Sequence, residues 1–458
     1  MSQDNKRRMM RLGAFVHETG QHVAAWRHPR AHFNSGTSFA EMLETARLSE
    51  RGKFDFLFLA DTAAVNLKGS PDARGRMGKT VKFEPMTILS ALAAVTKNLG
   101  LVATSTTSFN EPYTLARQFA SLDQISGGRS GWNLVTSNNE QDALNYSREQ
   151  HMSHADRYER AIEFADVVNG LWDSWDEDAF IRDKESGVFF DPDKMHVLNH
   201  KGRHFQVRGP LNVACSPQGR PVLVQAGASG TGRDVAARLA EVVFTAQTTF
   251  EQAREFYSDV MARVPRFGRS ADQVRVMPGF YPVVAPTEAE AKEKFDYLQS
   301  LIQVPVGVSI LEHTIGVHGL DKLSLDGPVP EMADTNGPLS RQHLLLEQAR
   351  RDKLTFWQLC LANAGPRGHA MVIGTPVQVA DVMEHWFRNG AADGFNVMPA
   401  WLPGSLQDFV DLVIPELQRR GLFRTQYEST TLRRNLGLPR PVSRFHLSGG
   451  AEKSRARG

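Results

Sequence analysis

Short apolar segments alternate with helical segments along most of the chain, and this alternation limits the folds that the chain can adopt. Strands that are apolar almost throughout and separated by helices form parallel sheets covered on both faces. Eight such units favour a closed barrel over an open doubly wound sheet. The predicted fold is therefore α/β, a (β/α)8 TIM barrel, with strands over residues 11–17, 54–60, 99–107, 131–136, 221–225, 242–247, 274–284 and 395–399.

Two stretches interrupt this repeat, and we interpret them as insertions after strands 4 and 7 of a single barrel domain over residues 1–445. Residues near 173–215 are aromatic, charged and loop-like, whereas residues near 303–339 are rich in Gly and Pro. Long loops in compact domains usually carry function, so 303–339 is a candidate lid. Residues 370–373 are a candidate extra strand, and residues 446–458 are expected to form a disordered tail.

The composition argues against several classes of protein. The 53 basic residues nearly balance the 51 acidic ones, which argues against a nucleic acid or a membrane surface as partner. Cys215 and Cys360 are too few for a disulfide framework or a cysteine-rich metal site, and they indicate reduced thiols in a cytoplasmic enzyme. The apolar run that begins at Leu12 is too short for a signal-peptide core, and no run of about 18 apolar residues occurs.

Residues 223–234 combine an apolar run, a turn of small residues and the start of a helix. Backbone N–H groups at a helix start have no partners within the helix, and the helix dipole adds partial positive charge there. Glycine lets a ligand approach the backbone closely, and Ser229 and Thr231 can donate hydroxyl groups. This turn is therefore a candidate phosphate site, although a plain turn capped by Ser229 or Thr231 fits the same residues.

Polar residues follow several predicted strands at the end where TIM barrels carry their active sites. Asp61 follows the second strand, Thr104 lies toward the end of the third, and Asn133 lies toward the end of the fourth. Ser229 follows the fifth strand and Gln247 ends the sixth. Each residue taken alone fits an ordinary turn or cap, but their joint position on one rim favours a functional site.

His154 and Tyr158 add to this rim because they are four residues apart in a predicted helix. That spacing places both side chains on one helical face near the first turn, where an anion could meet the ring N–H, the phenol and free backbone amides. A solvated first turn explains the same pair. No metal site is predicted: His28 and His32 are also four apart, but Pro29 and the lack of a helical pattern argue against a zinc pair.

Several longer motifs occur in a characteristic order: 26–29 (WRHP), 52–61 (GKFDFLFLAD), 83–85 (FEP), 116–123 (ARQFASLD), 127–137 (GGRSGWNLVTS), His154 with Tyr158, Gly202 with Phe205, and 225–229 (QAGAS). These motifs resemble the bacterial-luciferase-like flavin-dependent monooxygenase family. The resemblance spans residues 10–440 and is closest to the branch of nitrilotriacetate, EDTA, dibenzothiophene-sulfone and long-chain alkane monooxygenases. It identifies the family but not a substrate.

The resemblance implies a two-component monooxygenase. Such an enzyme binds reduced FMN (FMNH2) from a separate NAD(P)H:FMN oxidoreductase, forms a flavin hydroperoxide with O2 and oxygenates a small organic substrate. A homodimer or a homotetramer is expected on the same basis. The resemblance places the flavin phosphate near His154, Tyr158 and Ser229. The complete set of positions that match the family's flavin contacts is Asp61, Thr104, Asn133, His154, Tyr158, Ala228 and Ser229.

Histidines are candidates for handling a proton, because a histidine can titrate near neutral pH and could protonate or stabilise a peroxide oxygen. His22, in the loop after the first strand, is the first candidate, and His17 and His28 are alternatives in the same region. His313 in the second insertion is a further candidate, because a closing lid could bring it into the pocket. A solvated surface histidine explains His313 as well.

Two other functions fit parts of the pattern. A TIM-barrel lyase, aldolase or phosphotransferase could use the Ser229 turn for a sugar phosphate, but the strand ends offer no Schiff-base lysine or metal-binding carboxylate cluster. A non-catalytic flavin-binding barrel is the other alternative, although such proteins are shorter. The substrate is not readable from the sequence. Four basic residues after the second strand either attract an anion or form a solvated loop: Arg74, Arg76, Lys79 and Lys82.

Overall fold

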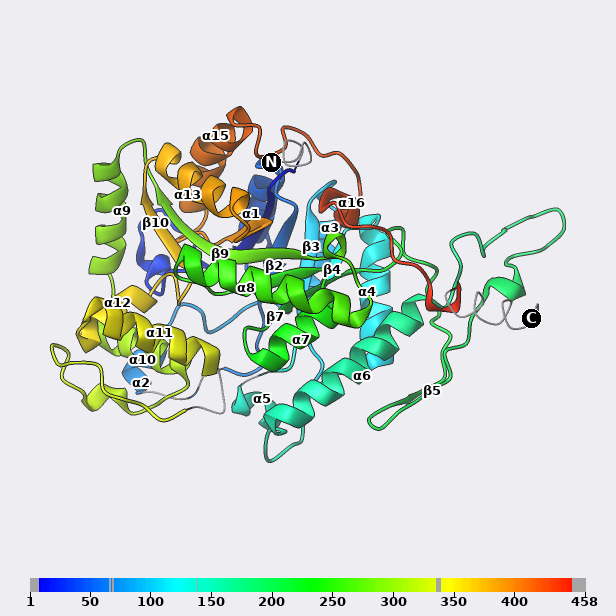
Figure 1. Cartoon of the computed structure of the whole chain (residues 1–458), viewed down its shortest axis with the longest axis horizontal. Coiled ribbons are helices and arrows are strands. Elements are labelled where there is room, and N and C mark those ends of the chain that lie inside the picture. The colour runs from blue at the N-terminus through cyan, green and yellow to red at the C-terminus, as the bar shows by residue number, and fades with distance from the viewer. Residues whose placement is uncertain (1–7, 66, 68–69, 138, 335–338, 447–458) are drawn as a thin grey trace.

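The computed structural model describes residues 8–65, 67, 70–137, 139–334 and 339–446, and its centre is a closed barrel of parallel strands (Figure 1). Each strand pairs in parallel with the next, β8 pairs with β9, and β11 closes the barrel against β1. The predicted TIM barrel is confirmed. Its eight strands are β1 (Arg11–Val16), β2 (Phe56–Leu59), β3 (Gly100–Thr106), β4 (Ser130–Val135), β7 (Val222–Ala226), β8 (Val242–Thr245), β9 (Arg275–Val284) and β11 (Gly394–Val397).

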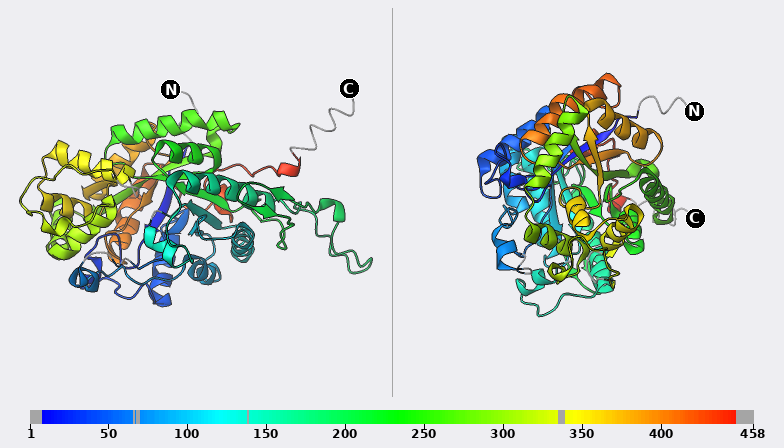
Figure 2. Two further views of the ribbon diagram at one scale, coloured as in Figure 1. Left: turned by 90° about the horizontal axis from the view of Figure 1, so that it is seen from below. Right: turned by 90° about the vertical axis from the view of Figure 1, so that its left-hand side faces the viewer.

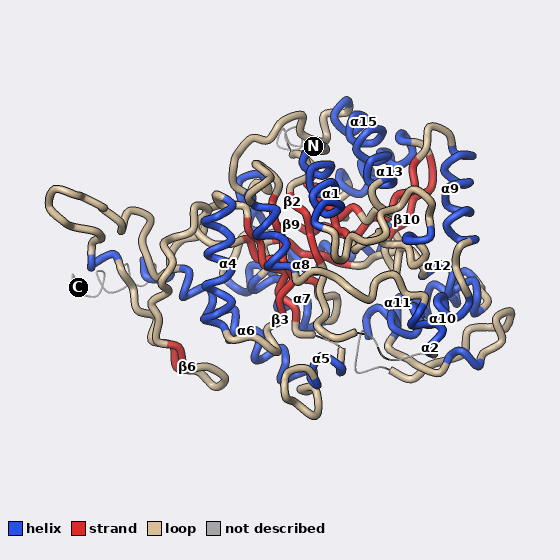
Figure 3. Tube along the Cα trace, turned by 180° about the vertical axis from the view of Figure 1, so that it is seen from behind, coloured by secondary structure: helices blue, strands red, loops and turns tan. Residues whose placement is uncertain are grey.

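The strands are buried on both faces, which is why they read as continuous apolar runs. In β2, Phe56 and Phe58 belong to the cluster inside the barrel, whereas Leu57 and Leu59 pack with the surrounding helices. Successive side chains of a strand point to opposite faces, so this division follows directly from strand geometry. Figure 3 shows the strands at the centre with helices around them.

Helices connect successive strands on the outside of the barrel, and polar caps fix where many of them begin. Ser38, Ser229 and Thr249 each accept a hydrogen bond from a backbone N–H of the following first turn. The connecting helices are α1 (Phe39–Arg51), α3 (Pro85–Ala93), α4 (Pro112–Ser126), α6 (His154–Trp172), α7 (Gly230–Leu239), α8 (Phe250–Arg263), α9 (Glu288–Ser300) and α13 (Pro376–Arg388). After β11 come α14 (Gly404–Asp408), a π-helical turn (Phe409–Val413), α15 (Ile414–Arg419) and α16 (Leu432–Asn435).

The segment after α9 is more helical than its composition predicts. It contains α10 (Val304–Ile315), α11 (Leu339–Asp352) and α12 (Phe356–Asn363), which enclose a buried apolar cluster of their own. Most of the Gly and Pro residues lie between α10 and α11, so the average composition over 303–339 conceals the helix at its start. Figure 1 shows these three helices together at one end of the molecule.

Residues 173–215 form an arm that projects from the barrel on the side away from α10 to α12 (Figure 2). Apart from the short antiparallel pair β5 (His200–Lys201) and β6 (Gln206–Val207), the arm consists mostly of loops and turns. The chain up to His446 ends beside this arm (Figure 1). Residues 447–458, most of the expected tail, lie outside the described residues.

Three small elements complete the fold. The predicted extra strand is confirmed as β10 (Ala370–Gly374), which pairs in parallel with Phe280–Val284 of β9. The short helices α2 (Pro71–Gly75) and α5 (Glu140–Leu144) lie in the loops after β2 and β4. In the described part of the chain, no helix is both long enough and apolar enough to span a membrane.

Candidate active site

A cavity of about 530 Å³ opens at the carboxyl ends of β4, β7 and β8. This volume falls in the usual range for small-molecule sites, and the carboxyl ends of the strands are where TIM barrels place them. The first turns of α6, α7 and α11 complete the wall. Its lining includes Asp61, His154, Arg157, Tyr158, Gln225, Ala228, Ser229, Phe244 and Arg341.

The turn between β7 and α7 presents bare backbone to this cavity. Ser229 is the N-cap of α7, and its Oγ accepts a hydrogen bond from the Gly232 N–H at 3.1 Å. A Cβ at Gly227 would lie 2.3 Å from Nε2 of Gln225, so a larger residue there would require the Gln225 side chain to move. Gly227, Ala228 and the N-cap Ser229 line the cavity, so only small residues separate it from the start of α7, as a phosphate site at a helix N-terminus requires.

The first turn of α6 meets this turn of α7. The rings of His154 and Tyr158 lie 4.6 Å apart and both line the cavity. Burial raises the pKa of Tyr158, and hydrogen bonds to Ser229 and Thr136 oppose part of that effect. The structure thus brings His154, Tyr158 and Ser229 together, as their predicted roles require.

Arg157 also lines the cavity, although the sequence motifs do not single it out. Its Nη1 donates to the Ser137 carbonyl at 3.0 Å, and its buried Nε has no partner among the described residues. Burial lowers the pKa of this guanidinium because it disfavours the charged form. A buried cation with a free N–H is suited to an anionic ligand. The available signal was its position three residues after His154, which places both near one helical face.

Asp61 lines the cavity, whereas Thr104 and Asn133 lie deeper in the barrel. Thr104 and Asn133 are paired in register on β3 and β4, and Nδ2 of Asn133 donates to Oγ1 of Thr104 at 2.9 Å. The buried Oδ1 of Asn133 and Oε1 of Gln225 have no partner in the described part of the structure. Buried acceptors are normally paired, so these two favour a ligand that carries N–H or O–H groups.

Neither histidine proposed for proton handling is among the residues that line the cavity. His22 is fully buried, and its Nδ1 accepts a hydrogen bond from the Ala24 N–H at 3.2 Å, which places the ring proton on Nε2. Burial and the charge of Lys79 lower the pKa of His22 to about 3, so it is neutral at pH 7 rather than titrating there. His313 is exposed on α10.

Phe244 gives the cavity one aromatic wall, and other rings pack against it from outside the lining. The ring of Phe244 lies 5.0 Å from that of Phe15 and 5.7 Å from that of Phe58. His369 stacks on Phe244 at 5.1 Å with an interplanar angle of 9°. An aromatic wall beside a polar rim suits a ligand with a flat ring and an anionic tail, and it limits the access of water.

A family model described as luciferase-like monooxygenase matches residues 19–393. The chain belongs to the luciferase-like monooxygenase family. This flavin-dependent monooxygenase is 49% identical over 443 residues to the N-acetyl-S-(2-succino)cysteine monooxygenase of Bacillus subtilis (strain 168), with 96% of this chain and 99% of the relative covered. It is 47% identical to the nitrilotriacetate monooxygenase component A of Aminobacter aminovorans, with 95% and 97% covered. The family and branch predicted from the motifs are therefore confirmed.

A solved structure supports the same assignment of the fold. The crystal structure of a riboflavin lyase with modified FMN and riboflavin has a TM-score of 0.83 to this monooxygenase at 32% identity, and the match covers 95% of this chain and 97% of that one. The neighbour's flavin ligands agree with the family's flavin chemistry.

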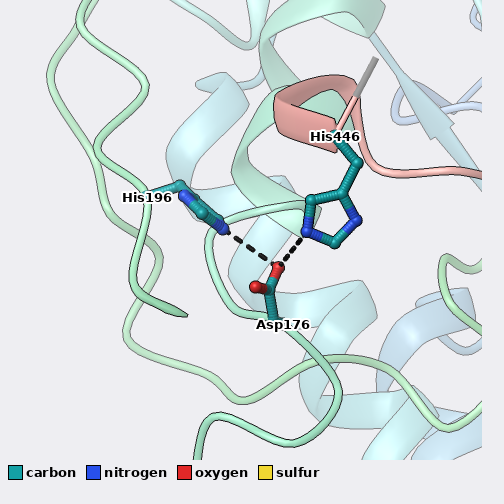
Figure 4. A group of neighbouring side chains, drawn as sticks. All are labelled: Asp176, His196 and His446. Carbon is teal, nitrogen blue, oxygen red and sulfur yellow. Dashed lines mark hydrogen bonds and ion pairs between the residues drawn. The ribbon is translucent and has the colours of Figure 1, made fainter. Parts of the chain in front are cut away.

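Away from the cavity, Asp176 and His196 of the arm meet His446 from the end of the described chain (Figure 4). Oδ1 of Asp176 lies 3.0 Å from Nε2 of His196 and 3.1 Å from Nε2 of His446, and the ring of Phe445 stacks on His196. These contacts fasten the end of the described chain to the arm. His446 comes from the far end of the chain and Asp176 and His196 are 20 residues apart, so no short spacing motif marks this cluster.

Proposed function

We propose that this chain is the oxygenase component of a two-component, FMNH2-dependent monooxygenase. The observation that carries the proposal is the convergence of the α7 N-terminus, the first turn of α6 and the buried Arg157 on one cavity. Backbone N–H groups, a hydroxyl and a guanidinium are the donors that a phosphate monoester needs. In this proposal the FMN phosphate is held by His154, Arg157, Tyr158 and Ser229, and backbone atoms of Ala228 complete the site.

The remaining lining residues suit the rest of FMN. The aromatic wall with Phe244 would support the ring system, and the unpaired acceptors of Asn133 and Gln225 would face its N–H groups or the ribityl hydroxyls. Thr104 orients Asn133 through their hydrogen bond, and Asp61 lies at the rim. When bound, reduced FMN supplies the activation of O2 that lets a small organic substrate be oxygenated. The protein contributes orientation, electrostatics and the exclusion of water.

The proposal includes a separate NAD(P)H:FMN oxidoreductase that supplies FMNH2. The name "component A" of the nitrilotriacetate relative supports a partner component. We also propose a cytoplasmic location and a homodimer or homotetramer. The arm supports self-association because Ile181 and Phe189 are 52% and 61% exposed on a segment that projects from the barrel, and exposed apolar clusters often mark interfaces.

Anaerobic titration of the purified chain with FMNH2, followed by mixing with O2, tests this function. We expect saturable binding of FMNH2 and a release of H2O2 that is much slower than from free FMNH2, because the cavity limits the access of water to the bound flavin. Riboflavin, which lacks the phosphate, is the matched control and should bind far more weakly. Binding of FMNH2 with undelayed H2O2 release would favour a flavin-binding barrel without oxygenase activity, and no binding would refute both.

His22→Ala is expected to lower the ratio of product to FMNH2 consumed by at least about tenfold, with H2O2 rising in its place. The reason is that His22, in the loop after β1, carries a neutral Nε2–H donor next to Gln21, whose carbonyl accepts a hydrogen bond from Lys79. Because its pKa is about 3, this contribution should not change between pH 5 and 8. Product and H2O2 are measured after single turnovers, with the midpoint of thermal unfolding as the control. Unchanged coupling removes His22 from the mechanism.

A further inference from the structure

Two lysines of the loop after β2 turn toward the barrel rather than toward solvent. Arg74 and Arg76 are exposed on this loop, and Arg76 pairs with a surface carboxylate. Lys79 and Lys82 are half-buried. The sequence leaves open whether this loop is solvated or attracts an anion. In the structure its two arginines are solvated, and its two lysines are placed where they could attract an anion. The inward pair joins two arginines from distant segments, Arg341 of α11 and Arg367 from the loop before β10.

These cations are connected through backbone carbonyls. Nζ of Lys79 donates to the Gln21 carbonyl at 2.7 Å, and Nη2 of Arg367 donates to the same oxygen at 3.4 Å. Nη1 of Arg341 donates to the carbonyl of Arg367, and its Nη2 lies 3.5 Å from Nε2 of His369. Loops after β1 and β2, the start of α11 and the loop before β10 therefore build one contiguous cationic wall.

The wall reaches the cavity at two points. Arg341 lines the cavity directly, beside the Phe244 ring on which His369 stacks. At the other end, Nζ of Lys82 lies 3.7 Å from Oδ1 of Asp61, which also lines the cavity. A molecule in the cavity can therefore contact Arg341 and Asp61 directly, whereas Lys79 and Arg367 are outside the lining and connect to Arg341 through backbone carbonyls.

Positive charge exceeds negative charge in this wall. Four basic side chains face two carboxylates, Glu18 and Asp61, and of these four only Lys82 lies within ion-pair distance of either carboxylate in the described structure. Burial and the neighbouring Arg367 hold the pKa of Lys79 well below its usual range and lower that of Arg341 to about 10. Buried cations that lack counter-charges cost free energy unless a ligand supplies the missing charge.

Unpaired polar atoms accumulate at the same place. Among the described residues, the structure leaves these buried atoms without a hydrogen-bond partner: Oε2 of Glu18, Oε1 of Gln21, Nε of Arg367, Nδ1 of His369 and the hydroxyl of Tyr281. Tyr281 is fully buried, yet burial is normally tolerated for a hydroxyl only when it is hydrogen-bonded. A cluster of unpaired donors and acceptors beside surplus positive charge indicates a binding site for a polar anion.

We propose that Arg341, which lines the cavity, forms with Arg367 and Lys79 beyond it a subsite for the carboxylate groups of an anionic organic substrate. The proposal rests on the flavin function, because it places the substrate in the cavity that would hold the flavin. The planar guanidinium groups match the geometry of a carboxylate, and Nζ of Lys79 adds a compact hydrogen-bond donor. Neutral substrates such as sulfones or alkanes would leave these cations buried and unpaired, so the same wall selects against them.

This subsite is separate from the predicted phosphate end of the cavity. The phosphate end is built from α6 and α7 around Arg157 and Ser229, whereas the cationic wall comes from α11 and the loops after β1 and β2. A phosphate at one end and a carboxylate at the other would each offset the positive charge nearby. Loss of binding at one end can therefore be measured without loss at the other.

Calorimetric titration of the full chain in the presence of FMN tests the proposal with three acids and their methyl esters: succinate, tricarballylate and nitrilotriacetate. We expect at least one acid to bind and its ester to bind at least a hundredfold more weakly. Lys79→Met and Arg341→Met should each weaken binding of that acid at least tenfold. Arg341→Lys keeps the charge and should recover part of the loss, which also guards against an Arg341→Met chain that fails to fold.

Arg76→Met is the matched control, because it removes a cation of the same loop that is exposed to solvent. It should leave the affinity for the acid unchanged. The proposal is overturned if no acid binds, if the esters bind as well as the acids, or if Lys79→Met and Arg341→Met lose FMN affinity to the same extent as acid affinity. A wild-type chain that binds an acid but not FMNH2 would instead refute the flavin function alone.

Discussion

Ser229→Asp is expected to weaken FMNH2 binding at least about a hundredfold, or about 2.7 kcal/mol, while the barrel remains folded. Ser229 lies at the N-cap of α7, where the FMN phosphate is proposed to bind. An aspartate there sets a full negative charge against the phosphate in a partly buried site, where charge repulsion is poorly screened. Aspartate is also a good N-cap residue and favours the positive end of the helix dipole, so α7 itself should not be harmed.

Thr249→Asp is the matched control for this prediction. Thr249 is the N-cap of α8 and accepts a hydrogen bond from the Gln252 N–H, as Ser229 does from Gly232, but it does not line the cavity. Both variants should unfold at nearly the wild-type temperature. Only Ser229→Asp should lose affinity in an anaerobic titration with FMNH2. Equal affinities in the two variants would show that the Ser229 turn is an ordinary helix cap.

The barrel was predictable because its evidence is distributed along the chain. Each strand is an apolar run, and each helix that follows has its own cap, such as Ser38 or Thr249. Short-range patterns therefore predict every strand of the barrel within a few residues. The segment containing α10 and α11 was less predictable, because Gly and Pro in the connection dominate its composition while the helices are stabilised by packing on one another.

The rim residues were predictable for a similar reason, whereas the cationic wall was not. Asp61 and Ser229 follow strands whose ends share one rim, so fold and position together indicate that they are near each other. Lys79 lies more than two hundred residues before Arg341 and Arg367 in the sequence, and no spacing rule connects the three. Only their shared hydrogen-bonding to backbone carbonyls in the folded chain brings them together.

Charged side chains lack counter-charges at one end of the barrel and form a buried ion pair at the other. At the carboxyl ends of the strands, cations such as Arg157 and Arg341 face a cavity and lack counter-charges. At the amino ends, Asp55 and Arg424 form a fully buried ion pair at 2.6 Å. An unpaired buried charge lowers stability, so its presence indicates a ligand-binding role. A buried charge with a partner contributes to the folded structure instead. The largest stability effect is therefore expected at the end away from the cavity.

Asp55→Ala is expected to lower the free energy of unfolding by about 3–5 kcal/mol. Oδ2 of Asp55 accepts a hydrogen bond from the Leu12 N–H at 2.7 Å, while Oδ1 pairs with Arg424, which also donates to the Asn435 carbonyl. This one carboxylate thus joins β1, the start of β2 and the C-terminal segment. Its removal leaves the Arg424 charge and the Leu12 N–H buried without their partner. Chemical denaturation monitored by tryptophan fluorescence measures the loss.

Asp411→Ala provides the comparison, because Asp411 pairs with Arg51 at the same 2.6 Å but on the surface. Exposed ion pairs contribute less than about 1 kcal/mol, so this variant should be nearly as stable as the wild type. The double variant Asp55→Leu with Arg424→Met should regain part of the loss, since it removes the unpaired charge along with its partner. If Asp55→Ala had an effect as small as that of Asp411→Ala, water or backbone groups would replace the carboxylate. The amino-terminal end of the barrel would then tolerate an isolated charge.

FMNH2 affinity of the folded fraction should be unchanged in all three variants, because none of these residues lines the cavity.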